Sequence, residues 1–106
     1  RDFTDVRDVV RAYVALMKLG QPGEIYNVGS GAARSIQSLL DALRSRSRVN
    51  VRVEVDAERL RPTETSSLAA NTSRLRNLTE WELRITYDSM HDGLLDYWRA
   101  EIGAQT

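Results

Sequence analysis

Residues 24–35, E-I-Y-N-V-G-S-G-A-A-R-S, constrain the fold of this chain more than any other stretch. Ile25, Tyr26 and Val28 are β-forming residues in a short apolar run, two glycines then allow a sharp turn, and Ser35 can cap a following helix. This order predicts a strand, a tight turn and a helix within one α/β unit. A glycine-rich turn can also present N–H groups to a phosphate, but G-S-G is too short for the dinucleotide-binding fingerprint. We therefore interpret the two glycines as turn residues.

Hydrophobic periodicity along the rest of the chain predicts a small α/β fold of about three short strands and about four helices. Residues 49–56 give the clearest strand signal, because valines alternate with polar residues throughout. We expect one three-layer-like domain that covers residues 1–106. The strands are expected at residues 1–6, 25–28 and 49–56, and the helices at residues 9–19, 35–43 and 72–78 and from residue 86 onward.

Composition removes several kinds of site from consideration. Basic and acidic residues, 15 of each, cancel, so net charge indicates neither a nucleic-acid nor a membrane partner. The chain has no cysteine and one histidine, which argues against metal centres and against an ordinary Ser-His-Asp triad. We expect that histidine, His91, to lie on a helix surface. No apolar run approaches a membrane span and no signal peptide is visible, which favours a cytoplasmic location.

No group of residues in the sequence stands out as catalytic. Tyr13 and Lys18 lack the four-residue spacing of a Tyr-Lys acid/base pair, and isolated carboxylates are more often solvated than catalytic. The residues therefore favour a binding role. The best local candidate is R-L-R-P-T-E at residues 59–64, a polar loop stiffened by its proline. There Arg61 can fork onto a phosphate, and Glu64 can accept hydrogen bonds from ribose hydroxyls.

Several blocks of the sequence, taken in order, resemble one known family. They are R-D-F-T-D-V-R-D-V-V-R-A-Y, then G-E-I-Y-N-V-G-S-G with S-I-Q-S-L-L, then R-L-R-P-T-E, then T-S-R-L-R-N-L-T-E-W-E-L, then L-L-D-Y-W-R. Together they resemble the C-terminal half of extended short-chain dehydrogenases/reductases that act on nucleotide sugars. Within that group they are nearest to GDP-4-keto-6-deoxy-mannose reductases and GDP-mannose 4,6-dehydratases. The resemblance covers nearly the whole chain.

The resemblance implies which part of such an enzyme this chain represents. In these enzymes an N-terminal Rossmann domain binds NAD(P) and carries the Tyr-x-x-x-Lys pair, while the C-terminal part binds the nucleotide sugar. It implies that Arg1 and Arg61 contact the diphosphate and that Asn27 lies near it. Glu64 would reach the nucleoside. The chain alone would then be inactive, with no catalytic residue and no cofactor, whereas the intact enzyme would use NAD(P) to transfer a hydride at C4 of a GDP-sugar.

The sequence departs from the family pattern mainly in one turn. Glu80 and Leu83 stand where the family usually has Gly and Pro, and Asn71 replaces a common Asp. Residues 65–67 are also more polar than is usual. These departures put the turn around Trp81 in question more than the binding residues.

Other interpretations stay open beside the substrate-binding part. One is a stand-alone or engineered α/β module for protein interaction without enzymatic activity. Another is RNA binding through Arg44, Arg46 and Arg48, which is disfavoured because no aromatic residue is interleaved with them. Without a Rossmann domain, a sheet edge and part of the helix at residues 9–17 should be uncovered, which predicts a homodimer or a swapped oligomer.

Overall fold

The first helix, α1 (Val6–Leu19), begins at a side-chain cap. In the computed structural model, which describes residues 1–60 and 67–105, the Asp5 carboxylate accepts a hydrogen bond from the Arg7 N–H at 2.9 Å. The cap satisfies a backbone donor that the first turn of a helix leaves without a partner, so α1 starts three residues earlier than its apolar pattern.

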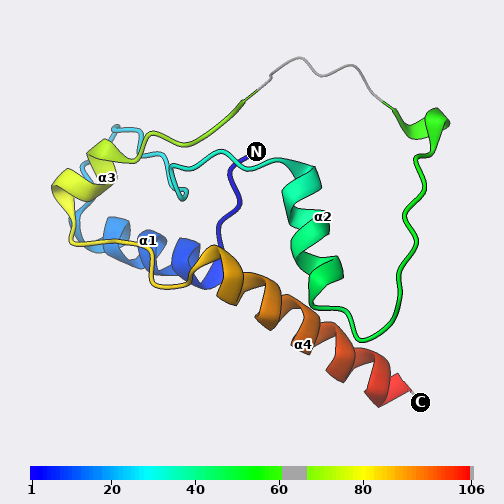
Figure 1. Ribbon diagram of the computed structural model, residues 1–106. Helices are drawn as coiled ribbons and strands as arrows, with labels where there is room; N and C mark the ends of the chain where they lie inside the picture. The colour runs from blue at the N-terminus through cyan, green and yellow to red at the C-terminus, as the bar shows by residue number, and fades with distance from the viewer. Residues whose placement is uncertain (61–66, 106) are drawn as a thin grey trace.

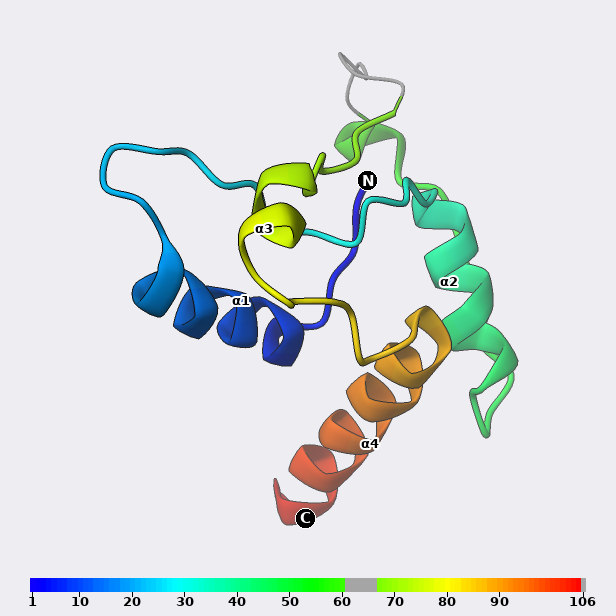
Figure 2. The ribbon, with the colours of Figure 1, turned by 90° about the vertical axis from the view of Figure 1, so that its left-hand side faces the viewer.

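The hydrophobic core lies where α1 meets α3 (Ser73–Leu78) and the turn after α3 (Figures 1 and 2). Among the described residues, its buried apolar side chains are Ala12, Leu75 and Trp81. The Trp81 indole N–H donates to the main-chain oxygen of Asp8 at 2.9 Å, which fastens the turn to α1. Since α3 has 6 residues, its helical form depends on this packing more than on propensity. The turn that the sequence departures put in question is therefore well anchored.

A buried carboxylate on α1 holds the segment that follows Trp81. The side chain of Asp8 is 0% exposed, forms an ion pair with Arg11, and accepts hydrogen bonds from the N–H groups of Arg84 at 3.2 Å and Ile85 at 3.1 Å. Arg11 in turn donates to the Glu82 carbonyl at 2.9 Å. Burial raises the pKa of Asp8, but the hydrogen bonds from Arg11 and the two amides outweigh it and hold the pKa below its ordinary value.

Helices α2 (Ile36–Ser45) and α4 (Tyr87–Gln105) contact each other at the end of the molecule away from α3 (Figure 1). Ser35 caps α2 as the sequence predicted, since its hydroxyl accepts from the Ser38 N–H at 3.0 Å. Arg46, immediately after α2, reaches Asp92 at 2.8 Å and Asp88 at 3.3 Å on α4. These ion pairs, with the contact between the Ser38 and Tyr87 hydroxyls at 3.3 Å, link the two helices.

The expected α/β fold is wrong for this chain. The described residues form α-helices and one short 3-10 helix, η1 (Ala57–Arg59), and they contain no strand. Their β contact is one antiparallel bridge between Asp2 and Ala33. A strand exists only where a neighbour completes its backbone hydrogen bonds, and residues 25–28 and 49–56 have no such neighbour in the described part of the chain.

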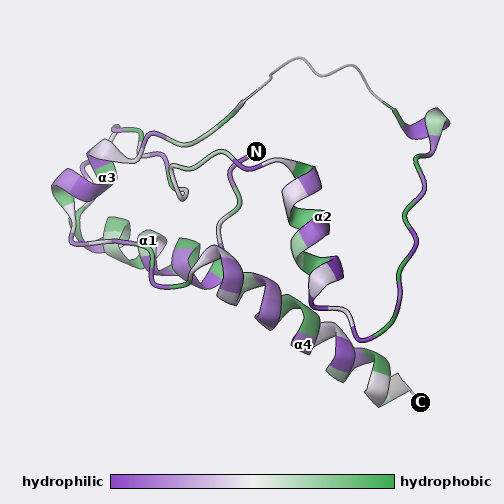
Figure 3. Ribbon diagram, in the orientation of Figure 1, coloured by the Kyte–Doolittle hydropathy of each residue, from purple (hydrophilic) through white to green (hydrophobic). Residues whose placement is uncertain are grey.

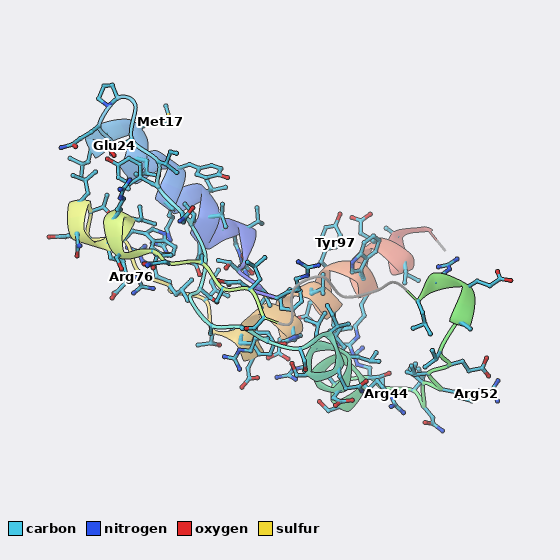
Figure 4. All side chains as sticks on the ribbon, turned by 90° about the horizontal axis from the view of Figure 1, so that it is seen from above. Met17, Glu24, Arg44, Arg52, Arg76 and Tyr97 are labelled. Atoms are coloured by element: carbon cyan, nitrogen blue, oxygen red, sulfur yellow. The ribbon has the colours of Figure 1, made fainter. Side chains whose placement is uncertain are left out.

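The molecule is more open than a compact domain of this length. Its radius of gyration is 17.2 Å, against about 13 Å for a compact chain of this size. Helix α4 projects away from the core and carries an apolar stripe that is largely exposed (Figures 2 and 3). The outer face of α1 is similar, with Met17 at its edge (Figure 4). None of the described helices is long and apolar enough to cross a membrane. The exposed apolar side chains on these two helices are Val6, Val10, Tyr13, Val14, Met17, Leu94, Tyr97, Trp98 and Ile102.

His91 does not lie on a helix surface, as the sequence had led us to expect. Its side chain is 0% exposed and packs edge-on against the Tyr87 ring, with the ring centroids 4.4 Å apart. Neither ring nitrogen has a hydrogen-bond partner in the described structure. The prediction failed because His91 lies in the first turns of α4, which are the covered part of this helix.

Candidate functional site

The turn at residues 29–31 is held by a carboxylate from the N-terminal segment. Asp2 accepts hydrogen bonds from the N–H groups of Ser30 at 3.0 Å, Gly31 at 3.0 Å and Ala70 at 2.9 Å, and from the Ser30 hydroxyl at 2.5 Å. Partial burial raises the pKa of Asp2, but these hydrogen bonds prevail and lower it to about 2. One side chain therefore fixes three segments that lie far apart in sequence.

Both glycines of this turn are required by geometry, so their interpretation as turn residues is confirmed. Gly31 has φ +80°, in the left-handed region that favours glycine. A Cβ on Gly29 would lie 2.6 Å from the Ala70 Cβ and 2.8 Å from the Asp2 carboxylate. The backbone N–H groups of Ser30 and Gly31 already donate hydrogen bonds to the negatively charged Asp2 carboxylate. They do not fit the pyrophosphate of a dinucleotide cofactor.

Asp2 and the turn form one wall of a pocket of about 690 Å³, which we call the Asn27 pocket. Its polar lining includes Arg1 and Asn27, and neither the Arg1 guanidinium nor the Asn27 side-chain amide has a hydrogen-bond partner in the described chain. The backbone of Arg1 is fixed nonetheless, since its carbonyl accepts from the Arg34 N–H at 2.7 Å. The pocket is lined by Arg1, Asp2, Thr4, Val9, Asn27, Val28, Gly29, Leu68, Ala69, Ala70 and Asn71.

The structure brings together two of the residues that the family resemblance indicated for binding. Arg1 and Asn27, which are 26 positions apart, line the same pocket. Arg61 and Glu64 lie outside the described residues, so their place relative to the pocket stays a prediction. The sequence reasoning missed Asp2, which supports the pocket. The only sequence signal close to Asp2 was the R-D-F block, which contains it. Local sequence patterns do not predict a contact between residue 2 and residues 30 and 70.

A second pocket, of about 250 Å³, lies on the other side of the N-terminal segment. It contains Arg34 and Arg84, but the Arg34 guanidinium already stacks over the Tyr87 ring, 4.3 Å from its centroid. It contains none of the residues that the sequence singled out for binding. We therefore take the Asn27 pocket, which contains Arg1 and Asn27, as the candidate site.

The basic end of α2 does not form a free patch for nucleic acid. Arg46 is committed to Asp88 and Asp92 on α4 and donates to the Ala42 carbonyl at 2.9 Å. This leaves Arg44 and Arg48 as single exposed charges. The described residues also contain no cluster of side chains that could hold a metal ion.

Comparison with known proteins places these features in a family. The model of the GDP-mannose 4,6-dehydratase family matches residues 1–93. The chain belongs to this family. Among curated relatives, the GDP-6-deoxy-D-mannose reductase of Pseudomonas aeruginosa is 32% identical over 96% of this chain and 34% of its own length. A putative GDP-L-fucose synthase 2 of Oryza sativa subsp. japonica is 34% identical over 99% of this chain and 30% of its own length.

A solved structure agrees with the family assignment. RMD from Pseudomonas aeruginosa, in complex with NADPH, superposes with a TM-score of 0.87 at 32% identity and covers 95% of this chain. That match takes up 33% of the RMD chain. The chain therefore spans about a third of the length of these matched relatives. The resemblance to nucleotide-sugar enzymes drawn from the sequence is confirmed.

Proposed function

We propose that this chain is the nucleotide-sugar-binding part of an NAD(P)-dependent reductase, dehydratase or epimerase, and that the Asn27 pocket receives the diphosphate of a GDP-sugar. The observation that carries the proposal is the meeting of Arg1 and Asn27 in one pocket, within a region that matches the family model. A guanidinium without an internal partner suits a phosphate oxygen, and a carboxamide can donate to a second one.

The names of relatives support the ligand class. One is a GDP-6-deoxy-D-mannose reductase, and another is a probable UDP-arabinose 4-epimerase 3 from Oryza sativa subsp. japonica, 29% identical over 93% of this chain. Both names contain a nucleoside-diphosphate sugar. We infer that the diphosphate is the shared element and that this chain supplies groups that bind it.

The proposal assigns cofactor chemistry to residues outside this chain. RMD was solved with NADPH, but the glycine turn of this chain already holds the Asp2 carboxylate, so we derive no cofactor step here. In a complete enzyme the cofactor would supply the hydride, and the residues described here would bind and orient the sugar nucleotide. We also keep Arg61 and Glu64 as proposed ligands of the diphosphate and the nucleoside, on the sequence evidence alone.

Arg61→Ala tests the binding assignment in a full-length protein that contains this chain as its C-terminal part. We expect GDP-sugar binding to weaken by about 1.5–3 kcal/mol, the range for a hydrogen bond to a charged partner. Arg61→Lys should recover only part of the loss, because an ammonium cannot fork onto two oxygens. Affinities for the GDP-sugar and for NADPH are measured by calorimetry.

The control is Arg59→Ala, two positions away. Arg59 is exposed and pairs with Asp56 at 3.3 Å, so its loss should leave GDP-sugar affinity unchanged. NADPH affinity should not change in any of these variants. Equal losses for Arg59→Ala and Arg61→Ala, or an equal loss of NADPH binding, would show that Arg61 has a structural role instead.

A further inference from the structure

Residues 50–56 form an extended segment whose backbone has no partner in the described chain at positions 50–55. The chain leaves α2 and runs outward to η1 without helix or ladder (Figure 1). Among the described residues, no backbone hydrogen bond closes on positions 50–55. Such a segment presents a row of free N–H and C=O groups, which is the template on which another strand can pair.

Hydrophobic and hydrophilic residues alternate along this segment, as they do in a half-buried strand (Figure 3). Val51, Val53 and Val55 fall on one face, and the charged Arg52 and Glu54 fall on the other. Arg52 and Glu54 pair only with each other, at 2.5 Å, and both side chains are largely exposed, with Arg52 far from the core (Figure 4). The central Val53 is 43% exposed although its type is usually buried.

We propose that residues 50–56 pair antiparallel with the same segment of a second copy, about a two-fold axis that passes through Val53. In this register Arg52 lies opposite Glu54 of the partner copy, and Glu54 lies opposite Arg52 of the partner copy. Val51 then faces Val55 of the partner copy, and the two Val53 side chains face each other. Directly opposite residues in an antiparallel pair have Cα atoms about 4.5–5.5 Å apart, so each charge pair can form a direct contact.

The charge pattern selects this register over its neighbours. An axis at Arg52 places two arginines opposite each other, and an axis at Glu54 places two glutamates opposite each other. Parallel in-register pairing places every charge opposite its own kind. An axis between two residues sets valines against charged residues and splits the apolar face. Like charges directly opposite are destabilising, so the axis at Val53 is the favoured solution.

This pairing gives the expected homodimer a specific surface and a specific order of residues. It does not depend on nucleotide binding, because the strand lies outside the Asn27 pocket. The two copies would place their valines on a common face of a two-stranded ribbon. The contact is two-fold symmetric because each copy pairs through the same edge of its segment, while the outer edge of each copy stays open to solvent.

Cysteine cross-linking tests the axis directly, because the chain has no cysteine of its own. Val53→Cys places the two thiols opposite each other, at a Cα separation compatible with a disulfide, so mild oxidation should give a covalent dimer. Val49→Cys is the matched control. In the proposed register its partner position is Ala57, which separates the two thiols by about 27 Å along the strands. Equal cross-linking of the two variants would overturn the proposal.

Charge reversal tests the register by sedimentation. Arg52→Glu and Glu54→Arg each place like charges opposite each other and should weaken self-association about tenfold or more. An equimolar mixture of the two variants restores opposite charges and should recover the dimer. Arg44→Glu and Glu80→Arg, at exposed sites outside the segment, carry the same charge changes and should associate like the wild type. A monomeric wild type at high concentration, or a mixture that stays monomeric, would contradict the proposal.

Discussion

Asp8→Ala lowers the free energy of unfolding by about 3 kcal/mol, the low end of the range for breaking a buried ion pair. The Asp8 carboxylate is fully enclosed and holds Arg11 and the N–H groups of Arg84 and Ile85. Without it, two amides lose their acceptor and one guanidinium loses its counter-charge. We expect the low end because Arg11 remains 29% exposed and keeps its bond to the Glu82 carbonyl.

This loss is measured by urea unfolding, followed by the fluorescence of Trp81. The second tryptophan, Trp98, is largely exposed and is replaced by phenylalanine in every protein of the series. Asp88→Ala is the control, since Asp88 also lies in the first turn of a helix but its side chain is 81% exposed. It should cost less than about 1 kcal/mol. Equal effects of the two substitutions would show that the buried contacts of Asp8 do not stabilise the fold as described.

Acid weakens the fold through Asp2, and Asp2→Asn removes this part of the pH dependence. The pKa of Asp2 in the folded chain is about 2, below its ordinary value of 3.8, so folding favours the charged form. The stability that this provides is fully present above about pH 4 and is lost as the pH falls through about 2. Because the carboxylate is only partly buried, we expect its contribution to be about 1–2 kcal/mol at neutral pH.

The measurement compares wild type and Asp2→Asn by urea unfolding at several pH values. The difference between them should be greatest near neutral pH and shrink toward zero as the pH approaches about 2. Asp41→Asn is the control, because Asp41 bonds only to Gln37 on an exposed helix face. It should change stability by less than about 0.5 kcal/mol throughout. A difference between wild type and Asp2→Asn that does not vary with pH would contradict this account.

The helices could be predicted from the sequence because their signals are local. Ser35 ahead of an apolar stripe, and Asp5 ahead of another, fix two helix starts within a few residues. The absence of strands could not be predicted. An alternating pattern such as that of residues 49–56 indicates which side chains share a face, but it does not show whether a second segment lies alongside to pair with the backbone. Whether a ladder forms depends on a second segment, and the described chain offers none.

The candidate site was predictable only through the family resemblance. That resemblance put Arg1 and Asn27 at one ligand, and the structure places both in one pocket. The residues that hold the pocket and the core were not predicted as such, because Asp2 and Asp8 act on partners about 30 to 80 positions away. Patterns of spacing along a sequence carry no signal for contacts of that range.

Titration of the isotopically labelled chain with GDP, followed in the amide spectrum by NMR, tests the central claim most directly. The affinity should be low, because a chain that supplies part of a binding site forgoes the preorganisation of the whole. At millimolar GDP we expect signals to move for the Asn27 side-chain amide and for residues 69–71, which line the same pocket. Signals from Arg84 and Thr86, in the second pocket, should stay in place. No movement around Asn27, or movement confined to the second pocket, would contradict the assignment.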